Sequence, residues 1–140
     1  MIKITVADAA FSQCVKLAVN YRCQRCGAQH EEKDRGLHCS HYIGRGNWSV
    51  RHDPANAFAH CYGCHAHLGS RPEEFTWWVI ERIGEGRHEM LIQRARDTRL
   101  GRLARKSVRE IAAHYRTELA VMRGRREKGE IGDFSFRGWA

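Results

Sequence analysis

Four cysteines in two matched pairs constrain the fold of this chain more than any other feature. The pairs are Cys23 with Cys26 in "CQRCG" and Cys61 with Cys64 in "CYGCH". A Cys-x2-Cys turn directs two thiolates at one point, and two such turns complete the tetrahedral four-cysteine site that zinc prefers in structural roles. We therefore expect one structural zinc ion that joins two segments lying far apart in the sequence.

Two disulfides, or a redox-active pair, are the alternative for these cysteines. The chain opens with "MIKITVADAAFSQC", in which Lys3 and Asp8 interrupt the apolar residues and no small-residue cleavage site follows. No secretion signal is predicted, so a reducing compartment favours zinc over disulfides. Cys14 and Cys39 are expected to be buried thiols, although Cys39 is close enough in sequence to the paired cysteines to act as a substitute ligand.

The length and composition indicate one small domain with a modest core. The chain has 140 residues, of which 42% are hydrophobic, so a metal that ties distant segments together would add folding free energy. No apolar run reaches the roughly 18 residues that a membrane span needs, and we expect a cytoplasmic protein. We divide the chain into a helical lead-in (1–22), a zinc-bound core with its following helix (23–84), a basic helical segment (85–126) and a mobile or docked tail (127–140).

The positive charge is concentrated in one part of the chain. Residues 87–128 contain 13 Lys or Arg and 5 Asp or Glu, whereas the remaining residues contain 11 of each kind. Such an unbalanced basic stretch is more often a phosphate-binding surface than a helix face that only contacts solvent. The excess of Arg over Lys favours nucleic acid over an anionic membrane as the partner. The arginines expected to contact DNA are Arg45, Arg51, Arg94, Arg102, Arg105 and Arg109.

Periodicity and capping signals predict an α+β fold in which a zinc-stapled hairpin is flanked by helices. Strands are expected over 37–43 and 56–61, separated by a wide polar loop. Helices are expected over 8–20 with Asp8 as cap, from Ser70 to Gly84 with Glu73 as capping-box partner, around 88–99, and from Ser107 with Glu110 as partner. The 3.6-residue period predicts a buried face on the first and on the last of these helices, made of Phe11, Cys14, Val15 and Ala18, and of Ile111, Tyr115, Leu119 and Met122.

Three polar residues in this hairpin or directly after it are candidate functional residues. His41 lies late in the first strand, Asn56 starts the second, and His65 directly follows the last paired cysteine. At this point the sequence resembles the His-Asn-His (HNH) nucleases, which have a ββα-metal core, and within them the lambda NinG, or Rap, family of phage recombination nucleases. The resemblance covers about residues 23–69 and is carried by "CQRCG", "SHYIGR", "DPANAFAHC" and "CYGCHAH".

Hydrolysis of a phosphodiester needs a base that deprotonates the attacking water, a divalent metal that neutralises developing charge, and a rigid framework that holds both. His41 on a clamped strand is suited to be the base, since an ordinary histidine is largely neutral at cellular pH. Asn56 is expected to fix the imidazole or the hairpin loop. His65 is the first candidate ligand of a catalytic magnesium or manganese ion, and His67 is the second.

One departure from the HNH pattern concerns the metal. Many HNH nucleases have an aspartate or histidine just before the first motif histidine, where this chain has Ser40, a weak ligand. Water and substrate phosphate then complete the coordination of the catalytic metal ion, or Asp53 or His67 supplies the missing ligand. Alternatively the catalytic metal is absent and the protein only binds DNA.

Two other function classes stay open at the level of sequence. A noncatalytic zinc-stapled module for nucleic-acid or transcription-complex binding uses the same cysteines and basic helices, and a structural adaptor between proteins leaves the arginine excess unexplained. The resemblance favours the nuclease and implies branched DNA, such as displacement loops or Holliday junctions, as substrate. A homodimer, or recombination proteins of phage or host, are further partners that the sequence neither requires nor excludes.

Overall fold

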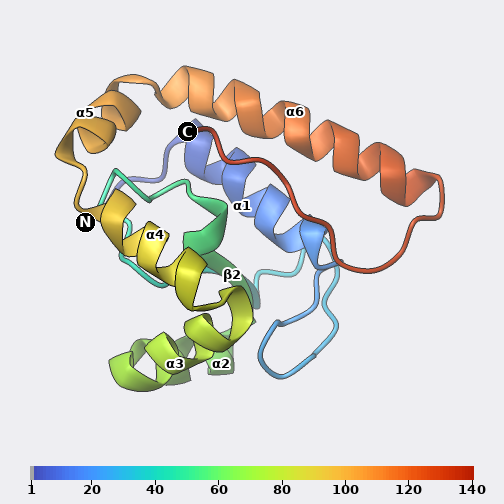
Figure 1. The fold of residues 1–140 in the computed structure, drawn as a ribbon. Coiled ribbons are helices and arrows are strands. Elements are labelled where there is room, and N and C mark those ends of the chain that lie inside the picture. Colours follow the sequence, from blue (N-terminus) through green and yellow to red (C-terminus); the bar gives the residue numbers. More distant parts are fainter. Residues whose placement is uncertain (1) are drawn as a thin grey trace.

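The computed structural model describes residues 2–140 and shows a mixed α+β fold, which confirms the predicted class (Figure 1). None of the helices within these residues is long and apolar enough to cross a membrane. The elements, in chain order, are α1 (Val6–Ala18), β1 (Leu37–His41), a 3-10 turn (Pro54–Asn56), β2 (Ala57–Cys61), α2 (Tyr62–Gly69), α3 (Pro72–Ile83), α4 (Glu85–Ala95), α5 (Thr98–Lys106) and α6 (Val108–Glu127).

Strands β1 and β2 pair antiparallel to form the predicted hairpin. In their register His38 lies opposite His60, and His41 lies opposite Ala57. The first strand ends at His41 instead of residue 43. The reason is local, because the side chain of Asn56 binds both the N–H and the carbonyl of Ile43 and so replaces a partner strand there.

The two faces of the hairpin pack against different helices, since side chains alternate along a strand. Leu37, Ala57 and Ala59 belong to the hydrophobic cluster that contains α1 and α6. Phe58, on the other face, packs with side chains of α2 and α3. His41 therefore stands on the α1 side of the hairpin, whereas His38 stands on the side of α2.

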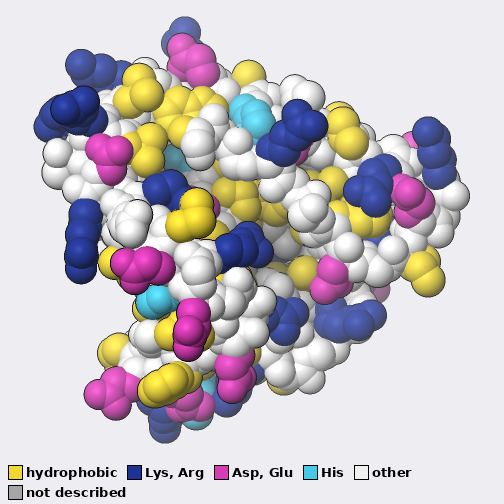
Figure 2. Space-filling view, viewed as in Figure 1, with side chains coloured by type: hydrophobic (Ala, Val, Ile, Leu, Met, Phe, Trp, Pro, Cys, Tyr) yellow, Lys and Arg dark blue, Asp and Glu magenta, His cyan; other side chains and the backbone are white. Residues whose placement is uncertain are grey.

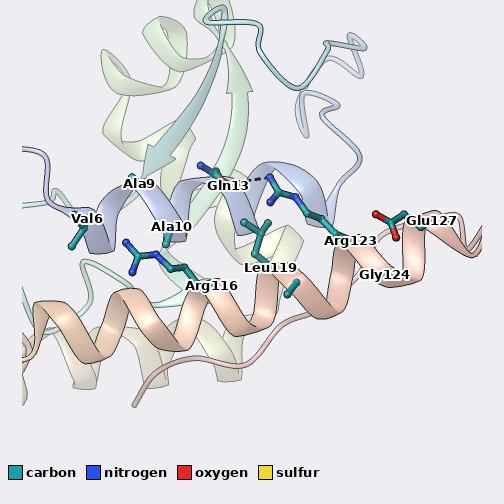
Figure 3. Close-up of a pocket in the computed structure, with 10 residues that line it drawn as sticks. Val6, Ala9, Ala10, Gln13, Arg116, Leu119, Arg123, Gly124 and Glu127 are labelled. Atoms are coloured by element: carbon teal, nitrogen blue, oxygen red, sulfur yellow. Dashed lines mark hydrogen bonds between the residues drawn. The ribbon is translucent and has the colours of Figure 1, made fainter.

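Helices α1 and α6 lie side by side and run in the same direction, although about 90 residues separate them (Figures 1 and 3). Both helices bury the faces that their 3.6-residue period predicted. The buried side chains on these predicted faces are Phe11, Cys14, Val15 and Ala18 on α1, and Ile111, Tyr115, Leu119 and Met122 on α6.

The capping predictions were wrong at three helices. Thr5, not Asp8, caps α1, and Asp8 is the third residue of a capping box in which its carboxylate accepts from the N–H of Thr5. Ser70 and Ser107 make no side-chain bond to the N-termini of α3 and α6. The hydroxyl of Ser70 instead donates to the carbonyl of His67 at 3.0 Å, which satisfies it within the preceding helix.

The single helix predicted around 88–99 is two helices, α4 and α5. The carboxylate of Asp97 accepts from the N–H groups of Arg99 and Leu100, at 3.1 Å each, and so starts a new helix. Helix α5 packs closely on the hairpin loop at Gly101, where an added Cβ would lie 2.8 Å from the hydroxyl of Ser49. The basic helices are thereby anchored to the loop that follows His41.

The C-terminal tail is docked, one of the two predicted outcomes, and runs back along α1 (Figure 1). Phe134 is buried, and its N–H donates to the carbonyl of Ala18 at 2.8 Å. The guanidinium groups of Arg125 and Arg126 lie 3.9 and 3.7 Å from the centre of its ring. These contacts tie the tail to the C-terminal ends of both long helices.

Replacing Phe134 by alanine should destabilise the protein by about 3 kcal/mol, because a buried aromatic ring is lost together with its cation–π contacts. Chemical denaturation measures this change. The matched control is Ile131→Ala, since Ile131 is 90% exposed and should contribute little. Equal stability of the two variants would show that the tail does not stabilise the fold.

Candidate metal clip and histidine site

The four paired cysteines come together as the sequence predicts. The sulfur atoms of Cys23, Cys26, Cys61 and Cys64 all lie within 4.8 Å of one another, and the sulfurs of Cys26 and Cys61 are 3.7 Å apart. Zinc–sulfur bonds of about 2.3 Å in a tetrahedron place neighbouring sulfurs about 3.8 Å apart. The four thiol groups thus have the composition and spacing of a structural metal site.

Hydrogen bonds aimed at the sulfurs favour thiolates at this site. The N–H groups of Cys26 and Cys64 point to the sulfurs of Cys23 and Cys61 at 3.5 and 3.4 Å, and the guanidinium of Arg25 donates to Cys64 at 3.4 Å. Cys61 ends β2 and also caps α2. A metal here would fix the segment after α1 to the junction of the hairpin and α2.

The other two cysteines lie outside the cluster, in agreement with the prediction that they are not ligands of this site. Cys14 is fully buried, and its thiol donates to the carbonyl of Tyr115 at 3.2 Å. Burial raises the pKa of Cys14 to about 12. Cys39 packs on the α1 side of the hairpin, so it does not substitute for a cysteine of the cluster.

His41 is held by the backbone of the hairpin loop. Its Nε2 lies 2.9 Å from the carbonyl oxygen of Arg51. Because a carbonyl can only accept, Nε2 carries the proton and Nδ1 of the neutral ring keeps its lone pair. Burial, which outweighs this hydrogen bond, lowers the pKa of His41 to about 4, and the nearby positive charge of Arg45 acts in the same direction. The imidazole is therefore neutral at pH 7.

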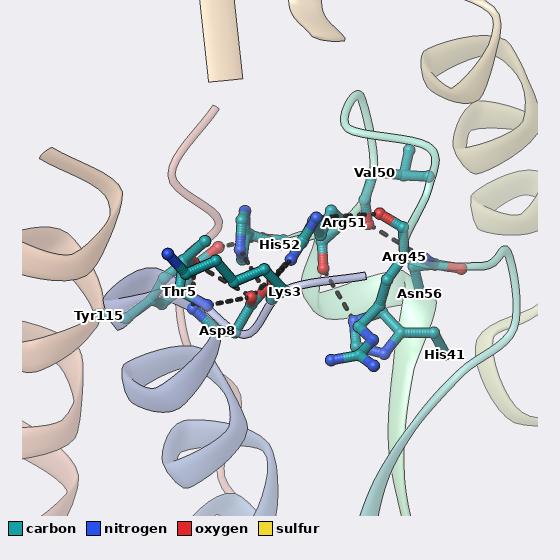
Figure 4. A network of polar contacts seen from close by, with 10 residues as sticks. All are labelled: Lys3, Thr5, Asp8, His41, Arg45, Val50, Arg51, His52, Asn56 and Tyr115. Atoms are coloured by element: carbon teal, nitrogen blue, oxygen red, sulfur yellow. Dashed lines mark hydrogen bonds and ion pairs between the residues drawn. The ribbon is translucent and has the colours of Figure 1, made fainter. Parts of the chain in front are cut away.

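Arg51 is the centre of a buried polar network (Figure 4). Its Nε and Nη2 donate to the two carboxylate oxygens of Asp8 at 2.9 and 2.6 Å, and Nη2 also donates to the carbonyl of Lys3 at 2.8 Å. The residue is only 2% exposed. The expectation that Arg51 contacts DNA disagrees with this burial, because its guanidinium is fully engaged by α1 and the N-terminal segment.

Three further groups complete the network around Asp8. His52 Nε2 lies 2.9 Å from the carboxylate of Asp8, and the hydroxyl of Tyr115 donates to the carbonyl of His52. Burial alone would raise the pKa of Asp8, but hydrogen bonds with His52 and Arg51 hold this pKa far below its usual range. The ring of Trp48 covers the guanidinium of Arg51, whose carbon lies 4.2 Å from the ring centre. The carboxylate stays ionised inside the protein.

Asn56 fixes the loop and does not contact the imidazole of His41. The side chain is completely buried. Its oxygen accepts from the N–H of Ile43 at 2.7 Å, and its nitrogen donates to the carbonyls of Ile43 and Val50 at 2.9 and 3.0 Å. Of the two roles predicted for Asn56, these bonds match the second, in which it closes the loop that carries Arg51.

The structure brings His65 to His38 and not to His41. The Nδ1 atoms of His38 and His65 are 2.8 Å apart. His67 instead lies 2.8 Å from the carboxylate of Glu74 in an ion pair at the surface. His38 was missed in the sequence, although it shares a strand face with Ser40, two residues further on, which is the position where HNH nucleases carry a metal ligand.

Neither Ser40 nor Asp53 offers a ready metal ligand. Ser40 is fully buried, and its hydroxyl has no partner among residues 2–140. Asp53 accepts from the N–H of Ala55 at 2.9 Å and pairs with Arg94 at 2.6 Å. Arg94, predicted to contact DNA, therefore serves an internal ion pair between α4 and the loop.

The remaining predicted DNA contacts stay accessible. Arg102, Arg105 and Arg109 are exposed on α5 and at the start of α6, and none of them forms an ion pair within residues 2–140. Figure 2 shows Lys and Arg side chains gathered around α5. Arg45 is half-buried on the loop close to His41. A basic surface thus lies on the helices that pack against the histidine loop.

An open groove of about 520 Å³ runs between α1 and α6 (Figure 3). Small side chains such as Ala9 and Ala120 line it, and Arg116 and Arg123 border it. No predicted catalytic or metal-binding residue contributes to its lining. The groove is therefore separate from the histidine site.

Fold and site together define an α+β protein in which four clustered cysteines stand at one end of a β-hairpin, a half-buried neutral histidine ends the first strand, and basic helices pack beside it. The chain belongs to the family described as bacteriophage lambda NinG protein, whose family model matches residues 5–125. The match extends well beyond the hairpin, over α1 and nearly all of α6. No curated protein and no solved structure matches the chain.

Purified protein should contain one zinc ion per chain, and Cys23→Ser or Cys64→Ser should abolish this stoichiometry and loosen the fold, because the metal joins segments that the small core does not hold by itself. Metal analysis and circular dichroism measure both effects. Cys14→Ala is the matched control and should keep its zinc. A zinc-free native protein, or a Cys23–Cys26 disulfide under reducing conditions, would contradict the assignment.

Replacing Asp8 by alanine should cost about 3–5 kcal/mol, since the charge of Arg51 is then buried without a partner. The double variant Asp8→Ala/Arg51→Met removes this unpaired charge and should recover part of the lost stability. Urea denaturation at neutral pH measures both variants. If Asp8→Ala unfolds at the wild-type midpoint, the buried ion pair does not support the loop.

Proposed function

We propose that this protein is a metal-dependent DNA endonuclease of the HNH type. The observation that carries the proposal is the orientation of His41, whose Nε2 is bound to the carbonyl of Arg51 at 2.9 Å. This arrangement leaves an unprotonated Nδ1 on a neutral ring, and its carbonyl partner would stabilise the imidazolium that forms when the ring takes a proton. Membership of the NinG family, together with the hairpin and metal clip, supports the same assignment.

In the proposed reaction, Nδ1 of His41 takes a proton from the water that attacks the scissile phosphorus. Arg45, half-buried beside His41, is placed to offset negative charge on the phosphate. Asn56 and the Asp8–Arg51 pair keep the loop, and thus the carbonyl that orients the ring, in place. Asn56 and the ion pair take no part in the chemistry themselves but position His41, so cleavage requires the native conformation of the loop.

His65 is the protein ligand proposed for the catalytic divalent ion. An ion at this place would lie on the α2 side of the hairpin, whereas His41 stands on the α1 side. Its proposed role is to neutralise charge on the phosphate and on the leaving 3′ oxygen, which requires the DNA backbone to pass over the end of the strands. His65 lies on α2, one residue after Cys64, so the structural zinc fixes its backbone. The imidazole suits this role because burial lowers its pKa and favours the neutral ring.

The basic helices are proposed to hold the DNA backbone. Arg102, Arg105 and Arg109 are exposed, and α5 contacts the hairpin loop through Gly101 and Ser49. Contacts to phosphate position a duplex without reading its sequence. Membership of the lambda NinG family makes a phage protein the context of this activity. We propose phage DNA recombination in the bacterial cytoplasm as the process, and branched DNA, a displacement loop or a Holliday junction, as the substrate, as the resemblance to recombination nucleases implies.

One observation favours a second candidate, a noncatalytic zinc-stapled module that binds nucleic acid. Ser40 stands where HNH nucleases carry a metal ligand, and its hydroxyl is fully buried. Such a module would use the same metal clip and the same basic helices. It would not need a neutral histidine held by a loop carbonyl, which is why we prefer the nuclease.

His41→Ala should retain zinc, fold and DNA affinity while cleavage falls by about 10² to 10⁴, the usual loss for a missing general base. Branched, nicked and linear DNA are incubated with magnesium or manganese, and products are measured on denaturing gels. His114→Ala, on α6 and away from the hairpin, is the matched control and should cut at the wild-type rate. Failure of the wild-type protein to cut any of these substrates would leave the binding module as the better account.

DNA affinity should fall steeply with salt, and the triple variant Arg102→Gln/Arg105→Gln/Arg109→Gln should bind more weakly with a slope reduced by about 0.9 for each lost phosphate contact. Fluorescence anisotropy measures both quantities. The control triple Arg22→Gln/Arg35→Gln/Arg137→Gln removes the same charge from exposed positions elsewhere. Equal losses in the two triples would mean that net charge, and not this surface, determines binding.

A further inference from the structure

The side of the hairpin that faces α2 carries an unusual set of polar groups. His38 and Ser40 come from β1, and His60 lies opposite His38 on β2. His60 is completely buried among Phe58, Phe75 and Trp78. Neither of its ring nitrogens, nor the hydroxyl of Ser40, has a hydrogen-bond partner among residues 2–140. Buried polar groups normally have hydrogen-bond partners, so this face has an unusual number of unpaired polar atoms.

The imidazoles of His38 and His65 meet at the edge of this face. Their Nδ1 atoms lie 2.8 Å apart, and their rings are inclined by 83°. Two neutral imidazoles at this distance share one proton in a hydrogen bond. When both rings carry their proton on Nε2 instead, the two Nδ1 atoms each offer a lone pair and form a bidentate ligand set.

We infer that His38 and His65 bind one first-row transition-metal ion through their Nδ1 atoms. Nitrogen ligands about 2.0–2.1 Å from a metal, at angles between octahedral and tetrahedral, are about 3.0–3.4 Å apart. The observed separation of 2.8 Å needs to open by only a few tenths of an ångström. Such a shift lies within the freedom of two side-chain torsions.

Both ligands are carried by parts of the structure that the metal clip holds rigid. His38 lies within the paired region of β1, opposite His60, and His65 follows Cys64 on α2. The edge of the Tyr62 ring packs against His38, with ring centres 5.9 Å apart. The pair is therefore preorganised, which lowers the cost of binding an ion.

The ligand type selects the ion. Imidazole nitrogen suits zinc, nickel, cobalt and, more weakly, manganese, whereas magnesium prefers oxygen ligands. Two protein nitrogens leave the other coordination positions for water or a phosphate oxygen. His38 thus supplies the second ligand that Ser40 does not, from the same strand face. The role of this ion in cleavage rests on the proposed function, whereas its binding does not.

Nickel binding to zinc-loaded protein tests this site separately from the four cysteines. The protein is titrated with Ni²⁺ by calorimetry, and its zinc content is measured again afterwards. The wild-type protein should bind one Ni²⁺ per chain and keep its zinc. His38→Asn and His65→Asn should each weaken nickel binding by about tenfold or more. Circular dichroism of the zinc-loaded variants establishes that they remain folded.

His67→Asn is the matched variant, since His67 lies on the same helix but pairs with Glu74. It should bind nickel like the wild type. Wild-type affinity in His38→Asn, or a tenfold loss in His67→Asn, would overturn the His38–His65 site. The cleavage assay, repeated with nickel beside magnesium and manganese, gives a separate answer. Nickel binding that depends on both histidines, without DNA cleavage in any of the three metals, would refute the nuclease and leave the metal site standing.

Discussion

The buried ion pair between Asp8 and Arg51 is the interaction on which the geometry of the site depends. It joins α1 to the loop after β1, and the carbonyl of the same Arg51 orients His41. Taking two charges out of water costs several kcal/mol for each ion, and only close geometry with additional hydrogen bonds offsets that cost. Here the guanidinium donates to the carbonyl of Lys3 as well as to Asp8, and the carboxylate is also bound by His52 and by the N–H of Thr5, so both charges have several partners.

The four-cysteine cluster lies at the other end of the hairpin. A metal bound there would join the strands and α2 to the segment after α1, while the Asp8 network and Asn56 hold the loop at the opposite end. His41 lies between these two supports, and α5 packs on the loop through Gly101. Polar contacts between distant segments, added to the hydrophobic clusters, thus relate the histidine, the cysteine cluster and the basic surface to one another.

Spacing and periodicity predicted the cysteine cluster, the hairpin and the buried faces of α1 and α6, because these depend on regular local patterns. The environment of Arg51 was not predictable, since its partner Asp8 lies 43 residues away and a loop arginine looks like a DNA contact. The pairing of His38 with His65 depends on strand register and on where α2 begins. Ser70 does not cap α3 as predicted, because its hydroxyl donates to the carbonyl of His67 in the preceding helix.

The central claim is that His41 presents an unprotonated Nδ1 at neutral pH because the carbonyl of Arg51 holds Nε2–H. Nitrogen-15 NMR of the histidine rings tests it directly, since the two nitrogens of a neutral ring have distinct shifts that depend on the tautomer. With the His41 resonances assigned by their absence in His41→Ala, the account predicts a neutral Nε2–H tautomer at pH 7 that titrates well below pH 6.5. An Nδ1–H tautomer, or an imidazolium at pH 7, would contradict it.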